Sequence, residues 1–313
     1  MYISSLSSFP IALHLSQLAP KLLRDLASSS SNIWSSTESL QLWETYENIV
    51  VSCLQAGDED SANMCLQKLS KRFGQDNERL MALTGMFKEA VAKNDEELMT
   101  ILDEYDKILN QNPVNMPVMK RRIALLRSIG KPVEAINALI KLLESSPTDA
   151  EAWAELSDLY VLLGVYKKAL FALEEVLLVT PFAWNIHARL GEILYMVALI
   201  DSDEVKLLQD SIARFCRSIE LCDDYLRGYY GLKLVTDKLL NILMETTTRS
   251  RVGALQQSDR KKIERLNVMA TSKLSDIIRT GSSDETGNLG YDAIELSAVK
   301  NLLSQDSDSS IIR

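Results

Sequence analysis

A spacing of 34 residues between like residues constrains the fold of this chain more than any other feature. It recurs in prolines, glycines and alanines: Pro113, Pro147 and Pro181; Gly130 and Gly164; Ala135 and Ala169. A fixed period of this length is typical of proteins built from stacked helical units, in which each unit buries its apolar face against its neighbours. The period therefore predicts an all-α solenoid.

The segment 150–183 shows the pattern of one unit most completely. Trp153, Leu156 and Tyr160 are spaced by three and four residues, which places them on one face of a first helix. Gly164 follows where the chain must turn, because glycine tolerates a positive φ. The segment therefore predicts a helix, a tight turn and a second helix.

The second helix of this segment carries the small residue at which the two helices cross. Ala169 occupies that position, and Pro181 ends the helix because proline cannot continue it. Residue types in this order are those of the tetratricopeptide repeat. The unit 116–149 repeats the pattern with Met119 and Arg122 in place of the first Trp and Leu.

The period divides the chain into a central repeat region with different segments on either side. We expect residues 1–39 to be loosely ordered, because residues 28–39 are serine-dominated. Residues 40–245 are predicted to form the solenoid, 246–280 a loop and a capping helix, and 281–313 a polar tail with room for one short helix. The predicted units lie near 43–75, 82–115, 116–149, 150–183, 184–223 and 225–244. A polar insertion at 201–206 is expected to delay the second helix of the fifth unit until Ser211.

Composition argues against several classes of function. The formal net charge of −9 does not favour a nucleic acid partner. Four cysteines without C-x-x-C spacing indicate neither a disulfide framework nor a metal site. The sequence contains no run of 18 apolar residues that would predict a membrane span, and the N-terminus lacks the basic start of a secretory signal. Any association with a membrane is therefore expected to be indirect.

The sequence offers no set of residues for catalysis. Its two histidines are His14, in the N-terminal segment, and His187, at a framework position where a packing role is expected. Phosphate-binding glycine loops, dinucleotide-binding turns and nucleophile elbows are absent. We predict no enzyme activity and no catalytic, cofactor-binding or metal-binding residue.

The inner wall of the predicted solenoid is the candidate partner-binding surface. Positions of the first helices that point into the groove include Lys120, Arg127, Glu151, Asp158, Glu192 and Tyr195. One hypothesis is a soluble co-chaperone or adaptor that binds peptide tails there. Lys120 suits a terminal carboxylate, but Ala124 and Glu151 stand where amide or basic groups are needed, and Glu155 adds a further negative charge.

The imperfect units carry a more specific resemblance. The segments that carry it are 59–73 (EDSANMCLQKLSKRF), 79–86 (RLMALTGM), 103–113 (DEYDKILNQNP), 119–127 (MKRRIALLR), 132–136 (PVEAI), 151–160 (EAWAELSDLY) and 166–181. In this order they resemble the tetratricopeptide subunit 2 of the endoplasmic reticulum (ER) membrane protein complex. The likeness covers residues 43–240, and the chain departs from that family in its N-terminus, in the 201–210 insertion and in its C-terminal tail.

The resemblance implies a non-catalytic, cytosolic scaffold within a hetero-oligomer. Such a subunit lies peripherally on the cytosolic face of the ER membrane, without a cofactor. It holds cytosolic segments of membrane subunits while the complex inserts tail-anchored and multipass proteins. These properties are expectations from the resemblance.

Overall fold

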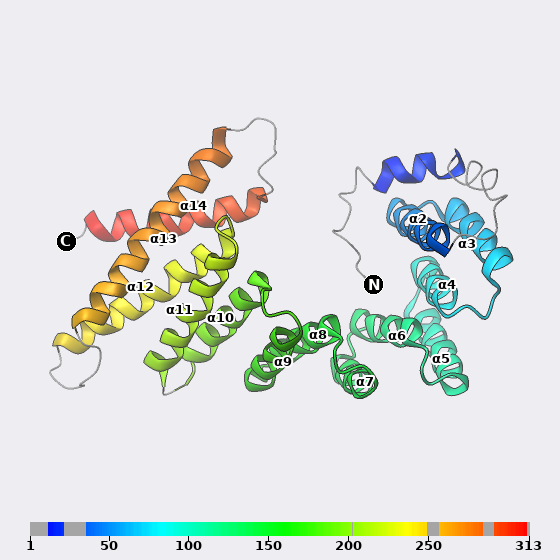
Figure 1. Cartoon of the computed structure of the whole chain (residues 1–313), viewed down its shortest axis with the longest axis horizontal. Coiled ribbons are helices and arrows are strands. Elements are labelled where there is room, and N and C mark those ends of the chain that lie inside the picture. Colours follow the sequence, from blue (N-terminus) through cyan, green and yellow to red (C-terminus); the bar gives the residue numbers. More distant parts are fainter. Residues whose placement is uncertain (1–11, 22–35, 202, 249–256, 284–290, 312–313) are drawn as a thin grey trace. The chain divides into compact units, whose positions relative to one another are not determined.

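The computed structural model is helical in every regular element that it describes (Figure 1). It describes residues 12–21, 36–201, 203–248, 257–283 and 291–311. Between Glu59 and Ser145, and between Ala150 and Ala198, successive helices are separated by turns of three or four residues and pack on one another, which is the arrangement that the 34-residue period predicts. The prediction of an all-α repeat fold is confirmed.

The chain divides into two compact units, Met1–Pro147 and Thr148–Arg313. The sequence predicted a single solenoid over 40–245, and the division falls inside it, two residues before the end of the predicted repeat 116–149. The last helix of the first unit packs on the helix before it, and the first helix of the second unit packs on the helix after it.

The first unit consists of helix pairs preceded by a short helix at residues 12–21. Its labelled helices are α2 (Ser36–Ala56), α3 (Glu59–Phe73), α4 (Glu78–Val91), α5 (Asp95–Gln111), α6 (Met116–Ser128) and α7 (Pro132–Ser145). Residues 74–77 separate α3 from α4, and α4 begins four residues before the predicted repeat 82–115.

The second unit continues the helix pairs and ends with longer helices. These are α8 (Ala150–Leu162), α9 (Tyr166–Val179), α10 (Trp184–Ala198), α11 (Glu204–Leu221), α12 (Leu226–Thr248), α13 (Gln257–Ser283) and α14 (Ala293–Ile311). Residues 249–256, within the segment 246–280 that is predicted to hold a loop and a capping helix, lie outside the described residues, and helix α13 begins at Gln257.

The framework positions of the repeat behave as their residue types require. Gly130 and Gly164 adopt φ angles of 77° and 72° at the turns that follow α6 and α8. Residues that carry a side chain are strained at positive φ, so glycine fits both turns. Ala135 and Ala169 are fully buried at the helix crossings, and Ser157 Oγ donates a hydrogen bond to the Ala169 carbonyl at 2.9 Å. A larger side chain at either alanine would overpack its crossing.

The short helix at 12–21 corrects the expectation that residues 1–39 are loosely ordered throughout. Ala12 and Ala19 are fully buried, and Ala19 belongs to the apolar core formed with α2, α3 and α4. Ser16 Oγ donates a hydrogen bond to Asp58 Oδ2 at 3.2 Å. Helix α2 also begins before residue 40, at Ser36. The sequence interpretation missed the helix because its packing against distant residues offsets a weak local pattern.

The C-terminal segment also contains more helix than expected. Helix α14 spans 19 residues where the sequence predicted a polar tail with one short helix around 291–303. Val299 is fully buried in the core that α11, α12 and α13 share. Contact with that core stabilises a helix whose own apolar periodicity is weak.

The fifth predicted repeat differs at its second helix. Helix α11 begins at Glu204, seven residues before the start expected at Ser211. The three residues that guided the prediction are nevertheless buried: Ser211, Phe215 and Ser218. Ser211 Oγ donates a hydrogen bond to the Gly191 carbonyl at 2.7 Å, and a Cβ atom at Gly191 would lie 2.9 Å from the Phe215 ring. The burial of these residues agrees with the predicted crossing, but the first seven residues of the helix, about two turns, were not predicted.

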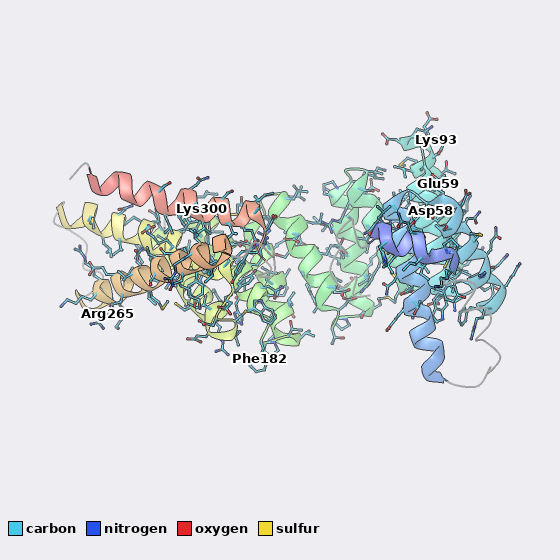
Figure 2. The ribbon with its side chains drawn as sticks, turned by 90° about the horizontal axis from the view of Figure 1, so that it is seen from above. Asp58, Glu59, Lys93, Phe182, Arg265 and Lys300 are labelled. Atoms are coloured by element: carbon cyan, nitrogen blue, oxygen red, sulfur yellow. The ribbon has the colours of Figure 1, made fainter. Side chains whose placement is uncertain are left out.

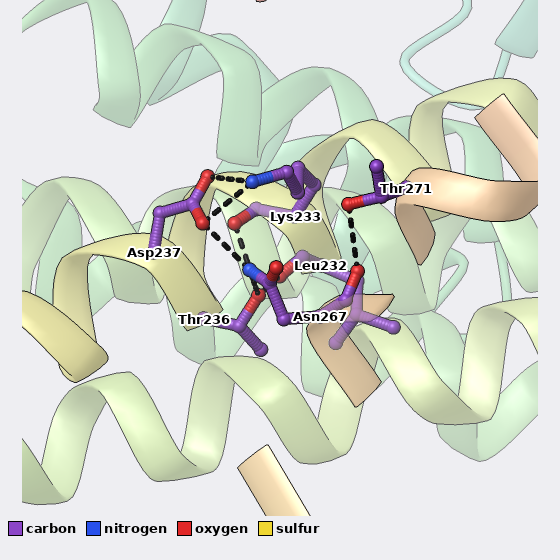
Figure 3. A network of polar contacts seen from close by, with 6 residues as sticks. All are labelled: Leu232, Lys233, Thr236, Asp237, Asn267 and Thr271. Carbon is purple, nitrogen blue, oxygen red and sulfur yellow. Dashed lines mark hydrogen bonds and ion pairs between the residues drawn. The ribbon is translucent and has the colours of Figure 1, made fainter. Parts of the chain in front are cut away.

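A polar network joins α12 to α13 inside the second unit (Figure 3). Lys233 is only 2% exposed, and its Nζ donates to both carboxylate oxygens of Asp237 at 2.6 Å. Asn267 Nδ2 donates to Asp237 Oδ1 at 2.6 Å and to Thr236 Oγ1 at 2.9 Å. Buried polar groups must find partners, so the network fixes α13 against α12.

Candidate functional site

The basic face predicted on the inner wall lies on α6. Lys120 is partly exposed and Arg127 is exposed, and their separation of seven residues places them on one face of this continuous helix. Both belong to the first unit, whereas the acidic and aromatic positions of the predicted wall belong to the second. The predicted wall therefore consists of two separate sets of residues, one in each unit.

Arg121, the neighbour of Lys120, has a structural role. Its Nε donates to Glu89 Oε1 at 2.9 Å, and its Nη2 donates to Glu89 Oε2. Tyr105 Oη donates to the same Glu89 at 2.5 Å, so the carboxylate joins α4, α5 and α6. Burial alone would lower the pKa of Arg121, but the hydrogen bond and charge of Glu89 raise it above its usual value. The guanidinium of Arg121 therefore serves to hold these helices together.

Arg122 has a similar structural role. Its Nε donates to Asp106 Oδ1 on α5 at 2.6 Å. The basic run at 120–122 thus contributes two arginines to contacts between helices.

In the second unit an arginine bridges two of the predicted acidic positions. Arg189 on α10 donates to Asp158 on α8 at 3.1 Å and to Glu192 at 2.8 Å. Burial acts to lower the pKa of Arg189, but its hydrogen bonds and the charges of both carboxylates raise it overall. The sequence interpretation missed Arg189, although its position three residues before Glu192 on a helix was a usable signal. The surface here is less acidic than expected.

The remaining predicted positions of the second unit differ in exposure. Glu151 is exposed near the start of α8, and Tyr195 is half-buried against the core of α11 and α12. Near the same core, Arg227 Nε donates to Glu295 on α14 at 2.8 Å. This contact ties the start of α12 to α14, and no local sequence pattern predicted it.

His187 is a packing residue, as expected from its position. It is 7% exposed, and its Nε2 lies 3.2 Å from the Pro181 carbonyl. Burial lowers its pKa, and the positive charges of Arg214 and Arg217 lower it further. The imidazole therefore stays neutral at physiological pH, with its Nδ1 buried.

The cysteines are free, and the two on α2 and α3 are fully buried. Burial raises the pKa of Cys53 to about 11 and that of Cys65 to about 12. Thiols with such pKa values are poor nucleophiles at neutral pH. In the described part of the chain, no group of three or more His, Cys, Asp or Glu side chains is arranged to hold a metal ion.

A run of apolar residues without charge surrounds the turn between α9 and α10. Four large side chains are exposed there: Leu178 (77%), Val179 (41%), Phe182 (68%) and Trp184 (44%). Phe182 lies on the outside of the second unit (Figure 2). Exposed apolar clusters of this kind mark interaction surfaces.

The fold and these surfaces define a class of protein: a tetratricopeptide-type helical repeat protein. Among the described residues, no helix combines the length and apolarity that a membrane crossing needs. The solved structure of the C-terminal part of a tetratricopeptide repeat-containing protein from Cytophaga hutchinsonii has a TM-score of 0.51 and 12% identity, covering 90% of this chain and 98% of that one. This likeness shows the fold alone.

Sequence comparison then narrows the class to one family. The family model of the EMC2 TPR-like repeat domain matches residues 67–202. The ER membrane protein complex subunit 2 of Xenopus tropicalis is 31% identical over 219 residues, covering 70% of this chain and 68% of the relative. The TPR repeat protein oca3 of Schizosaccharomyces pombe is 33% identical over 202 residues, covering 64% of this chain and 69% of the relative. The chain belongs to the ER membrane protein complex subunit 2 family.

Proposed function

We propose that the chain is a non-catalytic subunit of the ER membrane protein complex. The observation that carries this proposal is the 31% identity to the Xenopus tropicalis subunit over 219 residues. In the proposed role, the helix pairs hold cytosolic segments of the membrane subunits, and the chain lies peripherally on the cytosolic face. The complex so assembled inserts tail-anchored and multipass proteins.

The two units offer different surfaces for such segments. Lys120 and Arg127 on α6 present positive charge, which suits acidic segments. The region of Glu151, Asp158 and Glu192 retains negative charge beside Tyr195, although Arg189 offsets part of it. Opposite charges on different surfaces would allow one chain to select more than one partner segment.

The test is membrane insertion in cells depleted of this chain. A tail-anchored reporter with a glycosylation site at its C-terminus reports insertion as a shift in mass. We expect glycosylation to fall on depletion and to recover when the wild-type chain is supplied. Unchanged glycosylation after complete depletion would contradict the insertion role.

The alternative of a soluble co-chaperone makes a separate prediction. It requires saturable binding of a chaperone C-terminal peptide that Lys120→Ala abolishes. Ala124, on the same helix as Lys120, disfavours this reading, because its methyl side chain cannot supply the amide group that is needed there. Binding of that peptide by the purified chain, together with normal insertion after depletion, would favour the co-chaperone.

A further inference from the structure

A groove in the first unit lies among α5, α6 and α7, with a volume of about 670 Å³. The residues that line it include Leu109, Met119, Arg122, Ile123, Asn137 and Lys141. Pockets that bind small molecules commonly measure about 300–1,000 Å³. The groove is therefore large enough to receive a bulky side chain from another molecule.

The repeat itself indicates what kind of side chain fits. In the second unit, the rings of Trp153 on α8 and Phe171 on α9 pack edge to face, with their centroids 6.1 Å apart and their planes at 80°. The residues 34 positions earlier are Met119 and Asn137, and both line the groove. Helix α6 and helix α7 thus lack the aromatic pair that joins α8 to α9, at the two positions where the groove lies open.

The walls of the groove combine an apolar surface with polar groups along one edge. Leu109 and Ile123 supply apolar surface, and the ion pair between Arg122 and Asp106 holds α6 to α5. Asn137, Lys141 and Glu144 are exposed on α7 at spacings of four and three, so they share one face. An amide, an ammonium and a carboxylate in a row can bond the backbone of an extended peptide. Such charged walls do not suit a lipid chain, which would leave these groups desolvated.

We infer that this groove binds a large aromatic side chain, tryptophan above all, presented by an extended segment of a partner protein. The partner's indole takes the place that Trp153 fills in its own repeat, and the polar groups of α7 bind the backbone on either side. This inference rests on the proposed function only for the identity of the partner, which is then a subunit of the ER membrane complex. The binding chemistry of the groove does not depend on that identity.

The binding chemistry is tested on the purified full-length chain with N-acetyl-L-tryptophanamide as the probe. Saturation-transfer NMR should show saturable binding that N-acetyl-L-alaninamide does not compete away. Met119→Trp fills the groove from within and should weaken probe binding at least ten-fold. Met99→Trp is the matched control, because Met99 is a partly exposed methionine of α5 that does not line the groove. This variant should bind as the wild type does.

A second variant tests the same groove independently, in case Met119→Trp does not fold. Asn137→Phe changes an exposed position, restores the other half of the aromatic pair and should also weaken probe binding while circular dichroism stays unchanged. Absence of saturable binding to the wild type would overturn the inference. Binding to a folded Met119→Trp or Asn137→Phe variant at wild-type strength would overturn it as well.

Recovery of partners from membranes separates this inference from the proposed function. When detergent-solubilised complexes are isolated through the tagged chain, the wild type and Met99→Trp should retain the same membrane subunits. Met119→Trp should lose at least one of them or retain it at several-fold lower yield. If the wild type retains no membrane subunit, the proposed function fails. If all three retain the same subunits in the same amounts, the function stands and the groove inference fails.

Discussion

The carboxylate of Glu89 is expected to stabilise the first unit more than any exposed ion pair in it. Its side chain is only 9% exposed and accepts hydrogen bonds from Arg121, which is 27% exposed, and from Tyr105, which is 2% exposed. Glu89→Ala leaves a largely buried cation and a buried hydroxyl without this acceptor. Breaking a fully buried pair costs about 3–5 kcal/mol, and the partial exposure of Arg121 lowers the expected loss to about 2–4 kcal/mol.

The control is a neighbouring pair that uses the same kind of cation. Asp106 binds Arg122, but its side chain is 46% exposed. Exposed pairs contribute about 0–1 kcal/mol, so Asp106→Ala should cost much less than Glu89→Ala. A double variant, Glu89→Ala with Arg121→Met, should lose less stability than the two single changes added together, because the buried charge is then gone as well.

Hydrogen exchange followed by mass spectrometry is the suitable assay, because the two units need not unfold together. Glu89→Ala should lower the protection of peptides from α4, α5 and α6, while peptides from α12 and α13 keep theirs. Equal protection in Glu89→Ala and Asp106→Ala would refute the reasoning. Loss of protection throughout the chain would refute its assignment to the first unit.

Three further predictions concern packing, pH and partner binding. Ala169→Phe should destabilise the chain by about 1–3 kcal/mol, because the site is fully buried, and an unchanged melting temperature would show that the helix crossing is misplaced. Burial holds the pKa of His187 below its usual 6.5 in the folded chain, so the unfolded chain binds the proton more readily. The stabilisation that comes from neutral His187 is fully present above pH 6.5 and is lost as the pH is lowered. The wild type should therefore lose more free energy of unfolding between pH 7.5 and 5.5 than His187→Asn does. Equal losses in urea titrations would contradict this. Reversing the charges of Lys120 and Arg127 to Glu should reduce recovery of membrane subunits while helicity stays unchanged, and a loss of circular dichroism signal would assign both side chains a structural role.

Features that depend on local geometry could be predicted from the sequence. Gly130 and Gly164 sit at turns that need a positive φ, and Ala135 and Ala169 sit at close crossings, so residue type alone indicated their roles. The burial of His187 followed from its place in the period. These positions repeat because each unit solves the same packing problem.

Features that depend on distant residues could not be predicted in the same way. Arg121 and Arg122 are adjacent in the sequence, but their carboxylate partners lie 32 and 16 residues earlier, on different helices. The helix at 12–21 and helix α14 pack against cores whose members lie elsewhere in the chain. The groove of the first unit had a signal in the sequence, since Met119 and Arg122 replace the usual framework residues. Its shape required the structure, because side chains from α5 and α7 complete it.

The most direct test of the central claim is isolation of the chain, at its native expression level, from detergent-solubilised membranes, with quantitative mass spectrometry of the proteins recovered with it. A scaffold subunit should be recovered with the membrane subunits of the ER complex in near-equal amounts, and these should remain through a second purification on a sizing column. Recovery of the chain as a free monomer, with no membrane subunit in comparable amount, would contradict the proposed function.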